Sequence, residues 1–241
     1  MKIGIIGFGR FGQIFAKYLK TQGEVLVTNR SDKKAEAKAF GVRWVEGDEI
    51  FKVDLLILCI PISETKEIIM DIKNKILPGT ILIDTCSVKV YPCEWLNDLV
   101  EVKVETVGTH PMFGPDSAKD NLDGKQIVLC PLTIKQDNLD KLMELFTNLK
   151  LNVIITTPKE HDRQTAKSLA LVHFIGRGLS AMDVGEQKIT TLGFQRLLKV
   201  KETVDNDTWQ LFQDMNKYNP FAADVRSQLI KKLTKIDNQL T

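Results

Sequence analysis

The sequence lacks a long hydrophobic run and an excess of charge of either sign. Its longest apolar stretch, residues 55–62, is far shorter than the ~20 residues that a membrane-spanning helix needs. The 33 basic residues nearly balance the 31 acidic ones, so nothing in the charge calls for a nucleic acid or an anionic membrane as partner. The first predicted strand begins at residue 2, which leaves no room for a signal or transit peptide. We therefore expect a cytoplasmic protein with no membrane and no nucleic-acid partner.

Cysteines are also few, and their spacing does not indicate a metal. Cys59, Cys86, Cys93 and Cys130 show neither paired zinc-ligand spacing nor a C-x-x-C motif. They are typical of reduced thiols in an intracellular protein, and we expect no metal site. Cys86 lies next to a residue that we interpret below as catalytic, so a reactive thiol is one alternative; a packed, unreactive thiol is favoured.

What the sequence does contain is a glycine motif at its start. An apolar strand that begins at Lys2 leads directly into G-x-G-x-x-G, and a helical pattern over residues 13–20 follows. Gly7 makes the tight turn, Gly9 lets a diphosphate approach the backbone, and Gly12 lets the helix pack close to the strand. The helix N-terminus offers N–H groups and a positive dipole end to the diphosphate. The alternative is a glycine-rich turn without a ligand. The predicted dinucleotide site consists here of Gly7, Phe8, Gly9, Arg10, Phe11 and Gly12.

The end of the second strand indicates which dinucleotide binds. NAD enzymes usually place an acidic residue there, on the ribose 2′-hydroxyl. This chain has Asn29, Arg30 and Ser31 instead. A guanidinium beside a hydroxyl can bind a 2′-phosphate through charge-assisted hydrogen bonds. We predict NADP as cofactor, with NAD less favoured; the alternative is that Arg30 is only a solvated loop charge.

Alternating strand and helix patterns fill the first two thirds of the chain. Further strands are predicted at 24–28, 42–45, 53–61, 80–84, 102–107, 126–130 and 151–155, with helices at 33–40 and 137–149. This alternation predicts a doubly wound α/β (Rossmann) dinucleotide-binding domain over residues 1–157. Such sheets bind ligands beyond the carboxyl ends of their strands. That rule adds Cys59, Ile60, Pro61 and Thr85 to the predicted cofactor site.

Residues 158–241 show helical periodicity only, with helices predicted at 160–182, 190–204, 208–217 and 221–239. We expect a small all-α domain that serves substrate binding and dimerisation. So short a helical segment often buries its apolar faces against a second copy. A homodimer formed through the carboxyl-terminal helices is therefore predicted.

Two polar residues follow neighbouring strands at the ligand-binding edge of the predicted sheet. His110 is expected after a strand, in an extended turn held by Pro111. A neutral imidazole can accept a hydroxyl proton while hydride leaves the same carbon. Ser87 can hydrogen-bond the same hydroxyl or orient the imidazole. Singly, these residues would be interpreted as a structural histidine and a helix-capping serine; together at one edge they predict a catalytic pair.

A third group lies on a helix in the second domain. His173 and Arg177 are four residues apart and share one helix face, with Ser180 beyond them. An arginine on such a face can grip a carboxylate through two parallel hydrogen bonds, which suits an anionic substrate. The alternative is a solvated or interface stripe. His161 is interpreted as a helix-start or interdomain residue.

These motifs resemble those of the prephenate and arogenate dehydrogenase family of tyrosine biosynthesis. The resemblance rests on GTHPMFGPD at 108–116, SVK at 87–89, EHD at 160–162 and VHF at 172–174, and it spans nearly the whole chain. The segments VHFIGR at 172–177, GFQRLL at 193–198 and KYN at 217–219 look most similar to the plant and cyanobacterial arogenate dehydrogenases, a branch that is generally linked to NADP.

The resemblance implies oxidative decarboxylation of a cyclohexadienol, with His110 as catalytic base and Ser87 as its hydrogen-bonding partner. It places His173 near cofactor or substrate. An arginine of the helical domain meets a substrate carboxylate in the family, but some relatives carry it about where this chain has residues 199–201 (KVK), so Arg177 and Arg196 are proposed in its place.

Arogenate carries an ammonium group where prephenate has a keto group, so an acidic residue in the pocket would favour arogenate. Asp116 is the candidate for that contact. Prephenate-specific relatives share an acid there, so this residue decides little. The helical-domain match favours arogenate as substrate, with prephenate as the alternative.

Two other classes of protein stay open. A β-hydroxyacid dehydrogenase or an imine reductase would use a lysine or aspartate of the interdomain helix, for which Lys167 is the candidate. A non-catalytic NADP-binding protein would need neither Ser87 nor His110.

Overall fold

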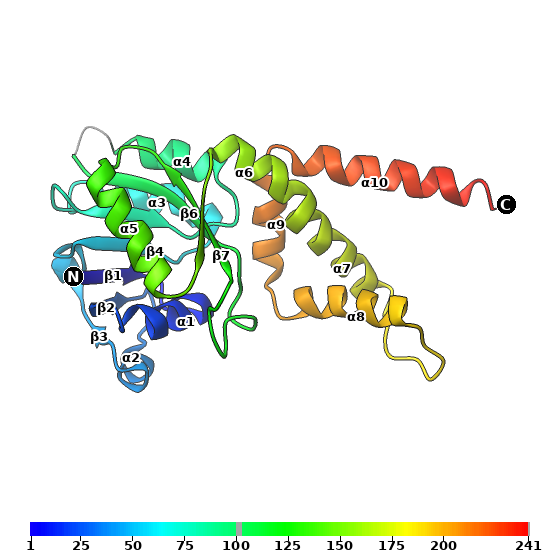
Figure 1. Ribbon diagram of the computed structural model, residues 1–241, viewed down its shortest axis with the longest axis horizontal. Helices are drawn as coiled ribbons and strands as arrows, with labels where there is room; N and C mark the ends of the chain where they lie inside the picture. The colour runs from blue at the N-terminus through cyan, green and yellow to red at the C-terminus, as the bar shows by residue number, and fades with distance from the viewer. Residues whose placement is uncertain (100–102, 241) are drawn as a thin grey trace. The chain divides into compact units, whose positions relative to one another are not determined.

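The computed structural model describes residues 1–99 and 103–240. The chain divides into two compact units, Met1–Pro158 and Lys159–Thr241. The first unit is a sheet covered by helices, and the second consists of helices (Figure 1). The predicted α/β fold, a Rossmann domain followed by an all-α part, is confirmed.

The sheet of the first unit has eight strands in the order β3-β2-β1-β4-β5-β6-β7-β8. All described neighbours pair in parallel except β6 and β7, which are antiparallel. Chain order reverses on either side of β1, and this is the place where a doubly wound sheet binds its ligand. The strands are β1 (Lys2–Ile6), β2 (Glu24–Thr28), β3 (Arg43–Trp44), β4 (Leu55–Leu58), β5 (Ile81–Asp84), β6 (Glu105–Pro111), β7 (Gln126–Pro131) and β8 (Asn152–Ile155).

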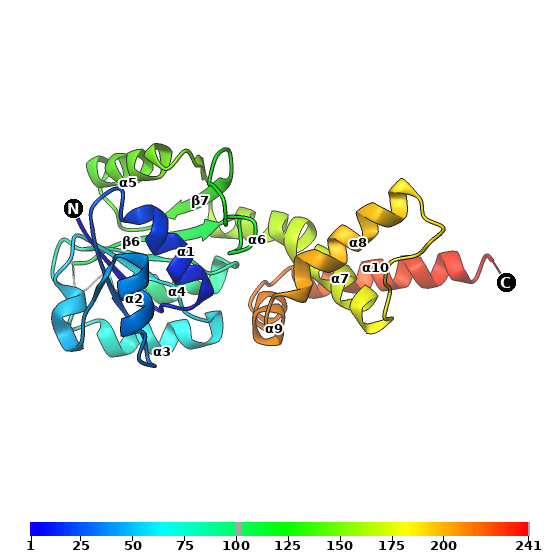
Figure 2. The same ribbon diagram turned by 90° about the horizontal axis from the view of Figure 1, so that it is seen from below.

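Helices cover both faces of this sheet because its central strands are apolar on both sides. Successive strand residues alternate between the faces: Leu55 and Ile57 pack with helices α1, α2 and α5, whereas Leu56 and Leu58 pack with α3 and α4. Figure 2 shows α5 and α3 on opposite sides of the strands. The helices are α1 (Arg10–Leu19), α2 (Lys34–Phe40), the 3-10 turn η1 (Gly47–Phe51), α3 (Ile62–Ile72), α4 (Val90–Asn97) and α5 (Gln136–Asn148).

The strand that carries His110 differs from its prediction. A strand was expected over 102–107, with His110 in a turn beyond it; residue 102 lies outside the described residues. In the structure β6 runs from Glu105 to Pro111, so His110 lies within a strand. The reason is tertiary, because the last residues of β6 pair with antiparallel β7 in the register His110↔Val128 and Pro111↔Ile127.

Two further elements carry no clear sequence signal. The 3-10 turn η1 lacks helical periodicity because it is a single short turn. Helix α4 contains Pro92 in its first turn, where a proline is tolerated because the N–H groups there have no partner within the helix.

The second unit contains six helical segments close to the predicted positions. They are α6 (Pro158–Thr165), the π-helical turn η3 (Ala166–Ala170), α7 (Leu171–Ala181), α8 (Leu192–Asp205), α9 (Trp209–Lys217) and α10 (Ala222–Asp237). Thr191 and Thr208 cap α8 and α9, since each hydroxyl accepts a hydrogen bond from the N–H three residues later. Helix α7 packs along α8, where Gly176 lies against Val200 and Val204.

Helix α10 exposes an apolar stripe. Leu233 and Ile236 are 55% and 54% exposed, and a spacing of four and three residues places them on one face with half-buried Leu229; Leu240, 81% exposed, lies in the turn after the helix. The carboxyl-terminal half of α10 extends beyond the other helices of this unit in both views (Figures 1 and 2). Across the described residues, none of the helices has the length and hydropathy to cross a bilayer.

Candidate active site

The glycine motif forms a turn that only small residues allow. Gly7 has φ +101°, and a Cβ on it would lie 2.2 Å from the Cys59 carbonyl oxygen. A Cβ on Gly12 would lie 2.0 Å from the Gly7 carbonyl oxygen, so α1 and the loop touch through backbone. By contrast, nothing lies within 4 Å of a Cβ built on Gly9. The loop is therefore tightly packed at its base and open at Gly9, as a backbone cradle for a diphosphate requires.

Helix α1 begins directly after this open position. Gly9 is the N-cap and brings no side chain to the first helical N–H groups. The side chain of Phe8 is buried against Phe40, at 5.9 Å between ring centroids, so Phe8 can face a ligand only through its backbone. Phe11 is half-buried and packs on Phe15 and Phe113. The predicted cofactor contacts within the motif are thus mainly backbone groups and the Arg10 side chain.

Asn29 joins the glycine loop to the segment that follows β2. Its Oδ1 accepts from the Phe8 N–H (3.0 Å), and its Nδ2 donates to Ser31 Oγ (2.9 Å). Arg30 extends from the same segment with its side chain 89% exposed, 3.6 Å from Glu64 Oε2 near the start of α3. The three residues predicted to contact the ribose are therefore held beside the glycine loop, with a cation at the outer position.

Arg10 and Asp116 form an ion pair at 2.7 Å, with both side chains more than half exposed. The segment that carries Asp116 also packs on α1, because Tyr18 Oη donates to the Ala118 carbonyl and Lys17 Nζ to the Lys119 carbonyl. Sequence reasoning assigned Arg10 to the cofactor and Asp116 to the substrate; the structure brings the two together.

The remaining predicted cofactor residues lie at the carboxyl ends of β4 and β5. Cys59 and Ile60 follow β4, and Pro61 is the N-cap of α3. Thr85 follows β5, and its hydroxyl donates to the Leu58 carbonyl at the end of β4 (2.9 Å). These residues share one edge of the sheet with the glycine loop, as the strand order requires.

Ser87 and His110 come from neighbouring strands at the same edge. Ser87 follows β5, and its Oγ is a buried atom without a hydrogen-bond partner among the described residues. His110 lies in β6 and is 5% exposed. Cys86 beside Ser87 is 4% exposed, and burial together with the nearby Asp84 carboxylate raises the pKa of its thiol. A buried, protonated thiol is unreactive, which favours the packed interpretation of Cys86.

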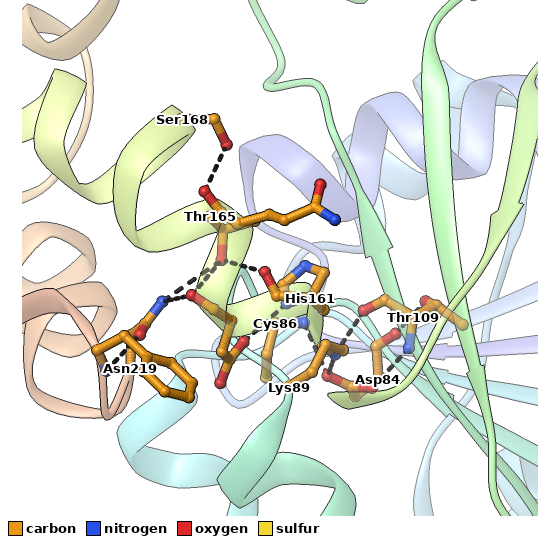
Figure 3. Close-up of polar contacts among 11 residues, drawn as sticks. Asp84, Cys86, Lys89, Thr109, His161, Thr165, Ser168 and Asn219 are labelled. Atoms are coloured by element: carbon orange, nitrogen blue, oxygen red, sulfur yellow. Dashed lines mark hydrogen bonds and ion pairs between the residues drawn. The ribbon is translucent and has the colours of Figure 1, made fainter. Parts of the chain in front are cut away.

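A buried polar network includes Asp84, Cys86, Lys89 and Thr109, which lie in the same segments as Ser87 and His110 (Figure 3). Lys89 and Asp84 form an ion pair in which neither side chain is exposed. Lys89 Nζ also donates to the Thr109 carbonyl (2.6 Å), and Asp84 accepts from the N–H groups of Thr109 and Cys86, both at 2.9 Å. Sequence reasoning missed these roles. The only available signal was the SVK motif, which does not show that its lysine is buried.

In the helical unit, His173 and Arg177 lie beside Asp207. His173 is 4% exposed, and its Nδ1 lies 3.8 Å from Asp207 Oδ2. Arg177 donates to the Asp207 carbonyl, and its guanidinium lies over the rings of Trp209 (5.7 Å) and Phe212 (5.9 Å). Burial lowers the pKa of His173; Arg177 acts in the same direction, and Asp207 opposes it. The imidazole is therefore neutral at pH 7.

His173 Nδ1 and Arg177 Nε are buried and, like Ser87 Oγ, have no hydrogen-bond partner among the described residues. Buried polar atoms are normally satisfied, so each such atom calls for an explanation. In the described part of the chain these three side chains alone show this feature, and all three were predicted from the sequence as site residues.

The other residues of the helical unit that the sequence analysis considered are Arg196, Lys167 and His161. Arg196 is exposed on α8, and Lys167 is exposed on η3. His161 is buried, with its Nδ1 2.7 Å from Asp162 Oδ1. Asn219 follows α9, and its Nδ2 donates to the Asp162 carbonyl of α6 (2.9 Å), which connects these two segments (Figure 3). His161 thus belongs to a packed structural network within this unit.

Comparison with known protein families gives two matches to this chain. Residues 15–155 match the model of the prephenate dehydrogenase nucleotide-binding domain, which is more than half of the chain. The chain belongs to the prephenate dehydrogenase family. This confirms the resemblance drawn from the motifs, and it makes the first unit the nicotinamide-dinucleotide-binding domain of an oxidoreductase. Residues 178–241 match a second model, the TYRAAT1-like C-terminal domain.

Two relatives from Arabidopsis thaliana are similar over most of this chain. Arogenate dehydrogenase 2, chloroplastic, is 28% identical over the full chain, which spans 70% of that protein. Arogenate dehydrogenase 1, chloroplastic, is 30% identical over 93% of the chain, which spans only 37% of that protein.

Among solved structures, the arogenate dehydrogenase of Synechocystis has a TM-score of 0.73 at 24% identity, over 100% of this chain and 93% of that one. A prephenate dehydrogenase from A. aeolicus, in complex with hydroxyphenyl propionate and NAD+, has a TM-score of 0.79 at 20% identity, over 100% and 90% of the two chains. At these identities the likeness shows a shared fold.

Proposed function

We propose that this protein catalyses the NADP-dependent oxidative decarboxylation of arogenate to tyrosine. The observation that carries the proposal is the set of buried, unsatisfied polar atoms on Ser87, His173 and Arg177, in a chain of the prephenate dehydrogenase family. The two Arabidopsis relatives, whose names state arogenate as substrate, support arogenate over prephenate. Prephenate, which would give 4-hydroxyphenylpyruvate, is the alternative substrate.

The chemistry assigns one task to each residue of the catalytic pair. When bound, the oxidised cofactor accepts hydride from the carbinol carbon. Ser87 Oγ, which has no other partner among the described residues, hydrogen-bonds the substrate hydroxyl and orients it. His110, buried in β6, accepts the hydroxyl proton as the carbonyl forms. Loss of carbon dioxide then makes the ring aromatic, so the reaction is effectively irreversible.

The cofactor proposal rests on the absence of a carboxylate at the end of β2. The side-chain oxygen of Asn29 already accepts a hydrogen bond from the glycine loop, so exposed Arg30 is the group that meets a 2′-phosphate. Glu64 lies 3.6 Å from Arg30 and weakens the attraction. We therefore expect the protein to prefer NADP over NAD only in part. Arg30→Ala should weaken NADP binding about 10-fold or more, which is the contribution of one charge-assisted hydrogen bond, and should have little effect on NAD binding. Equal losses for the two cofactors would contradict this role.

On the substrate side, Arg177 is the preferred carboxylate ligand. Its guanidinium is held in place by two aromatic rings and by the Asp207 carbonyl, and its Nε remains available. Neutral His173 lies on the same helix face and can donate or accept a hydrogen bond. Arg196 is exposed on α8 and is the weaker candidate. Asp116 can meet the arogenate ammonium only in competition with Arg10.

We also propose a homodimer formed through the carboxyl-terminal helices and a cytoplasmic location. The apolar stripe of α10, Leu229, Leu233 and Ile236, is followed by exposed Leu240 beyond the helix, and a second copy supplies the same surface in return. Sedimentation should give twice the chain mass, and Leu233→Glu with Ile236→Glu should give the monomer. A monomeric wild-type protein would refute the dimer.

The test of the reaction is the initial rate of reduced-cofactor formation with arogenate or prephenate, each with NADP or NAD. Turnover of arogenate with NADP should disappear in His110→Asn. Faster turnover of prephenate would select the alternative substrate. If neither substrate reacts although NADP binds, the protein is a binding protein or another oxidoreductase; loss of activity in Lys167→Ala with retention in His110→Asn would indicate the β-hydroxyacid dehydrogenase or imine reductase type.

A further inference from the structure

Beyond the end of β5, the side chains of Asp84 and Lys89 make the hydrogen bonds to the backbone of β6 that a neighbouring strand would otherwise make. Strand β5 pairs with β6 in the register Ile81↔Glu105 to Ile83↔Val107, whereas β6 continues to Pro111. Thr109 lies in this extension. Its N–H donates to Asp84 Oδ1 (2.9 Å), and its carbonyl accepts from Lys89 Nζ (2.6 Å). Both backbone groups are buried and need partners, which Asp84 and Lys89 supply.

The same carboxylate also holds the loop that carries Ser87. Asp84 Oδ2 accepts from the Cys86 N–H (2.9 Å) and from the Lys89 ammonium. Cys86 immediately precedes Ser87, and Thr109 immediately precedes His110. One carboxylate therefore ties together two backbone segments, each one residue before a candidate catalytic side chain (Figure 3).

Gly108 leaves space that Cys93 fills, beside the Lys89 side chain. A Cβ on Gly108 would lie 2.3 Å from Cys93 Sγ and 3.4 Å from Lys89 Cδ. Side chains alternate along a strand, so His110, two residues on, leaves β6 on the face where Lys89 and Cys93 pack. The Lys89 stem thus lies on the His110 side of β6.

The ion pair lies entirely in the interior of the first unit. Both side chains are 0% exposed. Burial acts to lower the pKa of Lys89, but the opposing attractions, of which that of Asp84 is the largest, together outweigh burial and raise the pKa, so the ammonium is charged at neutral pH. A buried pair of this kind adds little stability compared with apolar residues of the same size. The pair also fixes the position of both side chains, because moving either one away would leave the opposite charge unpaired in the interior.

We propose that Asp84 and Lys89 are positioning residues, and that their buried ion pair sets the spacing between Ser87 and His110. The proposal rests on the proposed function, in which these two side chains act on one substrate hydroxyl. Reacting groups must be held closely, since a displacement of about 1 Å can lower a rate about 10²-fold. Asp84 and Lys89 need no contact with substrate to control that displacement.

The decisive variant is the double substitution Asp84→Asn with Lys89→Met. It removes both charges together, so no unpaired ion is left buried and the protein is expected to fold. Asp84→Glu is the milder second variant, because it keeps both charges but lengthens by one methylene the carboxylate side chain that holds the Thr109 and Cys86 N–H groups. The matched control is Glu105→Gln. Glu105 is also a buried carboxylate on β6 and accepts from the Lys135 N–H and from Asn138, but it lies at the opposite end of the strand from His110.

Two readouts separate positioning from folding. The first is kcat, the KM for NADP and the isotope effect with substrate deuterated at the carbinol carbon. The second needs no cofactor: the chain has three histidines, so the His110 ring signal can be assigned by substitution in an NMR spectrum of the protein alone. The control should unfold at lower urea but keep its kcat within about twofold and its His110 signal.

In the double variant, kcat should fall about 10²-fold with a larger isotope effect and an unchanged KM for NADP, and the His110 signal should shift. A folded double variant with wild-type kcat and an unmoved signal would overturn the proposal. If the double variant does not fold, Asp84→Glu decides by the same measures, with a smaller fall in kcat expected. If the wild-type protein converts neither substrate, the proposed function fails, while the His110 signal still tests the positioning.

Discussion

The substitution Gly9→Ala should separate cofactor binding from stability. The backbone of Gly9 is extended, with φ −76° and ψ −167°, a conformation that alanine adopts without strain. A Cβ at this position meets nothing within 4 Å. The free energy of unfolding should therefore change by less than about 0.5 kcal/mol, as for other surface substitutions. The added methyl group points into the space where a diphosphate would approach the loop.

The expected loss of affinity follows from the size of that methyl group. An extra carbon forced into a close contact costs about 1–3 kcal/mol. If the diphosphate lies against Gly9, that cost appears as a Kd for NADP raised by about 5-fold to 150-fold. Gly12→Ala is the comparison, because its Cβ would lie 2.0 Å from the Gly7 carbonyl oxygen and must push α1 away from the loop. Gly12→Ala should therefore lose both stability and NADP affinity.

The assay is isothermal titration with NADP, together with urea unfolding of the cofactor-free protein, for the wild type and both variants. An unchanged Kd in a stable Gly9→Ala protein would refute the placement of the diphosphate at this loop. A marked loss of stability in Gly9→Ala would instead refute the openness of the cradle.

Three further predictions concern stability and reactivity. Gly178→Ala, with open space around its Cβ, should raise the free energy of unfolding by up to about 1 kcal/mol. The Cβ of Gly176→Ala would lie 2.8 Å from a Val204 methyl, so in urea unfolding this variant should be about 1–3 kcal/mol less stable than Gly178→Ala. Equal free energies of unfolding for the two variants would contradict the tight α7–α8 contact. Burial lowers the pKa of His173 below its ordinary 6.5, so as the pH falls the unfolded chain binds a proton on this histidine before the folded protein does. The contribution of neutral His173 to the free energy of unfolding should therefore be complete above pH 6.5 and be lost as the pH falls below it. In His173→Gln the decline of stability with pH should be less steep. Cys86, whose pKa is raised by burial, should resist iodoacetamide at about pH 8 in the native protein and react only after unfolding, as mass spectrometry of its peptide can check.

Local patterns in the sequence are sufficient to predict most elements of the fold. The apolar run into the glycine motif, the strand and helix alternation, and the caps at Thr191 and Thr208 are each encoded within a few residues, because backbone sterics and capping act at short range. The same is true of the candidate site residues, whose types and motifs indicate their chemistry. Ser87, His173 and Arg177 were named from the sequence, and their buried unsatisfied atoms single them out in the structure.

Tertiary structure alone decided how these residues are held. Strand β6 extends past its predicted end because β7 pairs with it in antiparallel register, which no pattern within residues 103–111 reveals. Arg10 meets Asp116 across 106 positions of the chain, and Asp84 reaches Thr109 across 25. Such pairs depend on which strands become neighbours in the sheet. The sequence by itself determined the elements and the chemical groups; packing decided which charges are buried together and which segments they fix.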